Sequence, residues 1–156
     1  MEHRHQEQQG NHYAQLGLMA GLSFVAMYWL MYAMVDSAAN VYMSFNQIYM
    51  AAVMTAPMVV IELIVMRMMY KDARLNLILI GASAALGVAA FLFIRQQTGI
   101  GDRQFLRSMI PHHAGAILMC EQASIADVEI KTLCKGIISS QQLEIDQMKA
   151  ILARLR

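Results

Sequence analysis

The stretch LNLILIGASAALGVAAFLFI, residues 75–94, is 20 residues long and contains no charged side chain. The hydrocarbon core of a bilayer is about 30 Å thick, and a helix needs about 20 apolar residues to cross it. The segment is therefore predicted to be a transmembrane helix. Two further apolar spans precede it, at residues 16–35 and 48–66, and the second of them contains Pro57 and Glu62.

The composition is typical of a membrane protein rather than a soluble one. Hydrophobic residues make up 58% of the 156 positions and charged residues 15%, whereas an average globular chain has about 45–50% apolar and about 25% charged residues. The net charge of +1 and the lack of a basic stripe give no reason to expect a nucleic-acid partner, so membrane lipid is the expected surrounding. Methionine is unusually frequent, with 15 residues, and its soft sulfur serves both as core filler and as a copper ligand.

The short loops set the expected orientation. The loop at residues 67–74 contains Arg67, Lys71 and Arg74, whereas residues 36–47 contain no Lys or Arg. The positive-inside rule therefore places the basic loop and the N-terminus in the cytoplasm, although three arginines just after the third span argue mildly against this. We expect an integral protein of a bacterial inner membrane, with its C-terminal domain periplasmic or otherwise extracytoplasmic.

The remainder of the chain is predicted to form two helices. Asp102 is the expected N-cap of a helix that reaches about residue 122 and that Pro111 should kink. After a short connection, Asp127 is expected to cap a last helix running to about residue 155, because apolar residues recur there at helical spacing. We therefore predict an all-α protein with a polar N-terminal tail (residues 1–13), three transmembrane helices (14–95) and an antiparallel helical hairpin (102–156).

Residues 108–120, SMIPHHAGAILMC, bring two adjacent imidazoles, two thioethers and a thiol into one short run. Imidazole together with soft sulfur suits copper, above all Cu(I). An isolated Met or His is more often a core or surface residue, so the clustering is what favours a metal site. At about 100° per residue these groups share about a third of the helix circumference. They are Met109, His112, His113, Met119 and Cys120.

Closing the hairpin symmetrically about Asp127 brings the polar and sulfur groups of both helices to one level. The groups that meet there are Cys120 with Cys134, His113 with Gln141, and Met109 with Ile145, Glu144 and Met148. Soft ligands favour Cu(I) or Ag(I), while imidazole with a carboxylate also admits Zn(II).

This segment resembles the DUF305 family. The resemblance rests on the motif MIPHH at residues 109–113 and on the spaced motif Q-x-x-E-I-x-x-M at residues 141–148, and it covers about a third of the chain. It implies a ferritin-like helical fold, and some members resemble periplasmic copper-binding proteins. The three preceding spans look like the membrane-anchored branch of the family. Carried over to this chain, the resemblance implies metal binding by His112, His113, Met109, Met119 and Met148, and Gln141 and Glu144 match the motif without an assigned role.

The cysteine pair has three possible roles. Cys120 and Cys134 can be small core residues, they can form a disulfide if the hairpin lies outside the cytoplasm, or they can add thiolates to a soft-metal site. A disulfide would remove both thiols from metal chemistry.

The favoured function is that of a membrane-anchored metal-binding protein, not an enzyme, in copper or silver handling or resistance. Because two helices bury little core alone, we expect a homodimer or higher homo-oligomer that completes a four-helix bundle. The alternatives are a Cu(I) transporter that uses the Met-x-x-x-Met pairs of the first two spans, and a structural membrane subunit without metal. A ferritin-like di-metal oxidase is disfavoured because the Glu-x-x-His repeats that it needs are missing. The N-terminal His3, His5 and His12 are expected to lie in a solvated tail.

Overall fold

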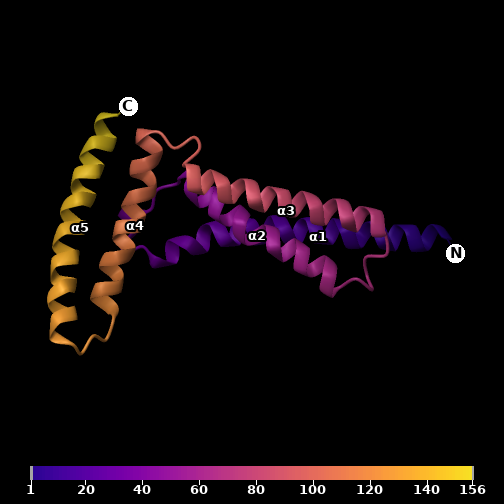
Figure 1. The fold of residues 1–156 in the computed structure, drawn as a ribbon, viewed down its shortest axis with the longest axis horizontal. Helices are drawn as coiled ribbons and strands as arrows, with labels where there is room; N and C mark the ends of the chain where they lie inside the picture. Colours follow the sequence, from indigo (N-terminus) through magenta and orange to yellow (C-terminus); the bar gives the residue numbers. More distant parts are fainter. Residues whose placement is uncertain (1, 156) are drawn as a thin grey trace. The chain divides into compact units, whose positions relative to one another are not determined.

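The computed structural model describes residues 2–155, and their side chains from residue 11 onward. Within this range every regular element is a helix, which confirms the all-α prediction (Figure 1). Two short 3-10 helices, η1 and η2, stand between the first two α-helices. The elements are α1 (Glu2–Leu30), η1 (Met31–Met34), η2 (Ala38–Asn40), α2 (Phe45–Val65), α3 (Ala73–Gln96), α4 (Asp102–Gln122) and α5 (Val128–Arg154).

The chain divides into two units. The first contains α1 and Ile48–Thr98, and the second contains Met31–Gln47 and the chain from residue 99 onward. The second unit therefore consists of the predicted hairpin together with the segment Met31–Gln47, which follows α1.

Three helical spans are long and apolar enough to cross a membrane, and most of their residues belong to the first unit: Asn11–Met34, Phe45–Val65 and Ala73–Gln96. Most of their large apolar side chains point outward rather than into the unit, as expected for helices whose surroundings are lipid. The three predicted spans are thus confirmed by length and composition. The helix of the first span begins at Glu2, so the predicted polar tail continues into α1, and the side chains of His3 and His5 lie outside the described residues.

Local contacts fix the ends of the second and third spans. Asp72 caps α3 by accepting a hydrogen bond from the Leu75 amide at 3.0 Å, and such a cap satisfies one of the free amides of a first helical turn. The Tyr70 hydroxyl donates to the Glu62 carboxylate at 3.3 Å. The carboxylate near the end of α2 therefore has a partner, as a charged group in a span requires.

The second unit is built on the antiparallel pair α4 and α5, which lie side by side (Figure 1). Its core is centred on Ile110 and Ile145, which are fully buried. Asp127 caps α5 through the amides of Glu129 and Ile130, at 2.8 and 3.0 Å, so the predicted cap is confirmed.

The start of α4 differs from the prediction by one residue. Gly101 is the N-cap, and Asp102 lies in the first turn, where its carboxylate faces the positive end of the helix dipole. The helix then runs through Pro111 without interruption as far as Gln122.

The segment Met31–Gln47 packs on α4, and its Val35 and Tyr42 lie against the core that α4 and α5 share. The close approach occurs at Gly115, where a Cβ atom would lie 3.2 Å from the backbone oxygen of Met34. The segment is held by its own polar contacts, because the Tyr32 hydroxyl lies 2.6 Å from Gln47 Oε1 and the Asn40 amide donates to Asp36 at 2.6 Å. One side of α4 is therefore occupied by this segment and another by α5.

Candidate metal centre

His113 is the buried imidazole of the hairpin, 8% exposed on the face of α4 that meets α5. Its Nδ1 lies 3.0 Å from the backbone oxygen of Met109, one turn earlier, and its Nε2 lies 2.7 Å from Oε2 of Glu144 on α5. A carbonyl oxygen only accepts hydrogen bonds, so Nδ1 carries a proton and donates it. The ring is therefore held in one orientation, with Nε2 toward α5.

The contact between Nε2 and Glu144 also contains a proton. Two lone pairs would repel each other at 2.7 Å, so either an imidazolium donates to the carboxylate or a carboxyl group donates to a neutral ring. The Glu144 side chain is 51% exposed, and water screens the pair. Its net contribution to stability is that of a surface ion pair, about 0–1 kcal/mol. The contact orients both groups more than it stabilises the fold.

His112 points in a different direction from its neighbour. Successive residues on a helix are rotated by about 100°, and His112 is exposed where His113 is buried. The two ring centroids lie 6.3 Å apart. In a single chain, the adjacent imidazoles therefore do not share one pocket.

The predicted sulfur ligands divide in the same way. Met148 is buried in the hairpin core and Met109 packs against that core, whereas Met119 is 58% exposed. Gln141 is half-buried on α5. The structure thus separates an inner group, made of His113, Met109 and Met148, from an outer group, made of His112 and Met119.

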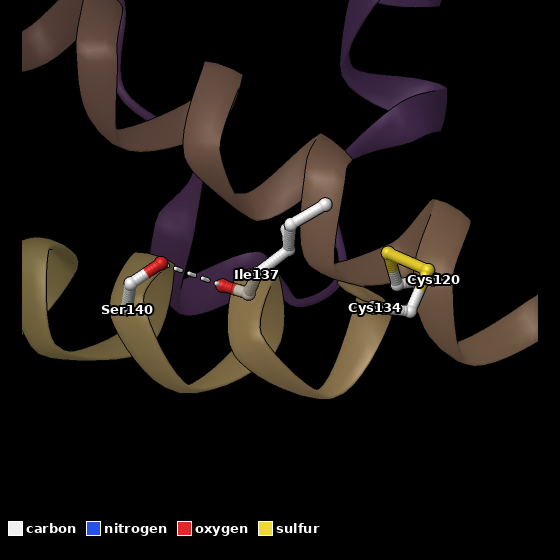
Figure 2. The surroundings of a disulfide bond; sticks show 4 residues. All are labelled: Cys120, Cys134, Ile137 and Ser140. Atoms are coloured by element: carbon white, nitrogen blue, oxygen red, sulfur yellow. Dashed lines mark hydrogen bonds between the residues drawn. A yellow bond between two sulfur atoms is a disulfide. The ribbon is translucent and has the colours of Figure 1, made fainter. Parts of the chain in front are cut away.

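Cys120 and Cys134 form a disulfide between α4 and α5 (Figure 2), with Cα atoms 5.3 Å apart. The predicted alignment of these two positions is confirmed. Of the three roles left open by the sequence, the structure shows the disulfide. Because a metal ligand must be the thiolate, the structure corrects the inclusion of both cysteines in the predicted ligand set.

Two comparisons bear on the family of the chain. The profile described as "Domain of unknown function (DUF305)" matches residues 94–152, which include α4 and nearly all of α5. An uncharacterized protein of Acanthamoeba polyphaga mimivirus is 36% identical over 138 residues, a match that covers 86% of this chain and 89% of the relative. The chain belongs to the DUF305 family. No solved structure matches this DUF305 protein.

Within the part of this DUF305 protein that the structure describes, no group of three or more His, Cys, Asp or Glu side chains is placed to hold a metal ion. A site in the hairpin would therefore need the thioethers as well as His113 and Glu144. A cavity of about 620 Å³ lies between α1, α2 and α3, lined by aromatic and aliphatic residues with Thr55 and Ser83. Met50 and Met54, which the transport alternative would use, are exposed and do not line this cavity.

Sequence reasoning missed two features of the centre. His113 contacts Glu144 rather than Gln141, which the symmetric hairpin had placed opposite it. The coverage of α4 by Met31–Gln47 was also not foreseen, and the only signal for it was Gly115 inside a helix, where glycine is unfavourable unless a close approach requires it.

Proposed function

We propose that this chain is a membrane-anchored protein that binds a soft metal ion, Cu(I) above all, through the α4–α5 hairpin, in copper or silver handling or resistance. The observation that carries the proposal is the orientation of His113. Its Nδ1–H donates to the Met109 oxygen, and its Nε2 points to Glu144. Metal-binding imidazoles are commonly held in this way, with one ring nitrogen hydrogen-bonded to a backbone carbonyl and the other free to bind.

The inner group supplies the first ligands in this proposal. Nε2 of His113 binds the metal in place of the proton that it shares with Glu144. Met109 and Met148 supply thioether sulfur, which prefers Cu(I) or Ag(I) over harder ions. Glu144 supplies the one carboxylate, which suits Zn(II) better than Cu(I), so the number of thioethers that bind decides the metal preference.

The proposed location is a bacterial inner membrane, with the N-terminus in the cytoplasm and the hairpin outside. The basic loop at residues 67–74 supports this orientation through the positive-inside rule. The disulfide supports it independently, because disulfides persist in oxidising compartments such as the periplasm and are rare in the cytosol.

The test is a Cu(I) titration of the full chain in detergent, in competition with a chromophoric Cu(I) chelator. Losing a second-shell partner typically costs about 10–100-fold in metal affinity, so removing both imidazoles with His112→Ala and His113→Ala should cost about 100-fold or more. His12→Ala, outside the hairpin, is the control and should titrate like the wild type. A double variant that binds Cu(I) as the wild type does, or a wild type that binds none, would contradict the proposal.

A further inference from the structure

One flank of α4 carries a regular stripe of side chains, of which three are exposed and two, Met109 and Ala116, are half-buried. Its members are three or four residues apart in alternation, which keeps them on one line of a helix that packs against another helix. Phe105 and Met119 at its two ends are both large, apolar and exposed. The stripe consists of Phe105, Met109, His112, Ala116 and Met119.

A second stripe with the same spacing runs along α5. It includes Leu133, which is 61% exposed, and Ile137, which is half-buried and points toward α4 (Figure 2). The stripe consists of Leu133, Ile137, Ser140, Glu144, Gln147 and Ile151. Glu144 is its one ionisable residue, as His112 is in the stripe on α4.

Both stripes lie on the same side of the hairpin. On α4 the stripe residue His112 is followed directly by His113, which lies in the interface with α5. On α5 the stripe residue Glu144 is followed directly by Ile145, which is fully buried. The helices are antiparallel, so equal steps along the sequence turn in opposite senses about the common axis. The stripes therefore face the same way, and Gly115, where Met34 approaches α4, belongs to neither of them.

The stripes are also in register with each other. The His113–Glu144 contact and the Cys120–Cys134 bond fix which residues of α4 and α5 are level. At that register large apolar residues meet near both ends, small residues meet at one layer, and the two ionisable residues meet at another. The layers are Phe105 with Ile151, Met109 with Gln147, His112 with Glu144, Ala116 with Ser140, and Met119 with Ile137.

We propose that this face binds a second copy of the chain, related by a two-fold axis parallel to the helices. Such an axis keeps every residue at its own level, so that His112 of each copy meets Glu144 of the partner subunit. A self-contacting surface must complement itself, and this one does so in size and in the hydrogen-bonding groups of its polar layer, His112 and Glu144. The product is a four-helix bundle in which all neighbouring helices are antiparallel.

The second copy also completes the metal centre, a consequence that rests on the proposed function. In one chain, His112 and Met119 are exposed and separate from the inner group. Across the two-fold axis both His112 rings enter the middle layer, next to the layer of Met109. The site is then shared, with ligands from each copy.

Cross-linking of two different single variants tests the interface without metal. A chain with Ala116→Cys and a differently tagged chain with Ser140→Cys are coexpressed, purified in detergent with a chelator present, and oxidised mildly. A disulfide between the two tags is expected, because positions 116 and 140 meet across the interface. Both substitutions are small, so the fold should be kept, and the native disulfide is checked by mass spectrometry.

The matched control replaces Ser140→Cys with Leu143→Cys. Leu143 is on the same helix and is 72% exposed, but it lies outside the stripe. It should give no cross-link to Ala116→Cys. Equal cross-linking at both positions, or none at position 140, would overturn the proposed interface.

The shared metal site is tested separately with a pair of leucine variants. Leu133→Glu should disrupt the stripe and lower Cu(I) affinity at least tenfold, whereas Leu143→Glu should leave it unchanged. Cross-linking at positions 116 and 140 without any Cu(I) binding would contradict the proposed function and leave the interface standing. Leu133→Glu is also introduced into the two cysteine variants, where it should abolish the cross-link between positions 116 and 140. If it does so and the Leu133→Glu chain still binds Cu(I) as the wild type does, the shared site would be overturned and the interface would stand.

Discussion

Reducing the disulfide between Cys120 and Cys134 is expected to loosen the α4–α5 hairpin while leaving α1–α3 in place. The bond joins residues 14 positions apart in the sequence. Cross-linking an unfolded chain over a loop of about 15 residues removes conformational entropy worth about 3 kcal/mol. That difference corresponds to an increase of about 150-fold in the population of the open hairpin.

Hydrogen exchange measured by mass spectrometry on the full chain in detergent resolves this change by segment. Amides of α4 and α5 that exchange through opening of the hairpin should exchange about 100-fold faster after reduction. Amides of α3 belong to the other unit and should not change. The double variant Cys120→Ser with Cys134→Ser is the control, and it should resemble the reduced wild type with or without reductant.

Two results would refute this reasoning. Unchanged exchange of α5 in a sample whose mass confirms reduction would mean that packing around Ile110 and Ile145, rather than the cross-link, keeps the hairpin closed. Thiol labelling of the native protein without reductant would mean that the bond itself is missing.

Three further predictions concern local features. Gly136→Ala should raise the free energy of unfolding of the second unit by about 1 kcal/mol, because the site is open and alanine favours a helix. Gly115→Ala should raise it less, because its methyl group would lie 3.2 Å from the backbone oxygen of Met34. Equal shifts of the melting temperature for the two variants would contradict this. Asp127→Ala should cost about 1 kcal/mol in chemical denaturation followed by circular dichroism, through loss of the helix cap. Burial, and after it the nearby Glu62 carboxylate, raises the pKa of the Tyr70 hydroxyl above its ordinary value of 10.0. The folded protein therefore keeps this proton to a higher pH than the unfolded chain does, and it loses stability as the pH rises past 10. A spectrophotometric difference titration against Tyr70→Phe should show a midpoint above 10.0 that Glu62→Gln lowers.

The elements of the fold were predictable because their signals are local. A span such as residues 75–94 needs only length and apolar composition to be recognised. Asp127 indicates the start of α5, because a short side chain that accepts hydrogen bonds, placed just before a periodic apolar run, is typical of a helix N-cap. The alignment of Cys120 with Cys134 followed from closing a hairpin about that cap, and the disulfide agrees with it.

The parts that were not predicted depend on contacts between distant segments. Residues 31–47 have no helical or strand periodicity that would show which surface they cover. Only the structure shows that their backbone approaches α4 at Gly115. The partner of His113 was also ambiguous, because side chains on α5 about a turn apart can both reach one imidazole. Only the structure shows that Glu144 is the partner, with its Oε2 2.7 Å from Nε2 of the ring.

The disulfide between Cys120 and Cys134 fixes the axial register of α4 and α5, and this register sets the level at which His112 and His113 meet Glu144. Seven residues separate Cys120 from His113 on α4, about 10 Å along the axis at 1.5 Å per residue. Sliding α5 by one turn would move Glu144 about 5 Å from the level of the two imidazoles. The contact of buried His113 with half-exposed Glu144 opposes this by itself with only about 0–1 kcal/mol. The covalent bond forbids the slip outright. The contact of His113 with Glu144 and the matching of the two stripes therefore both depend on the disulfide, which the proposed topology would place on the oxidising side of the membrane.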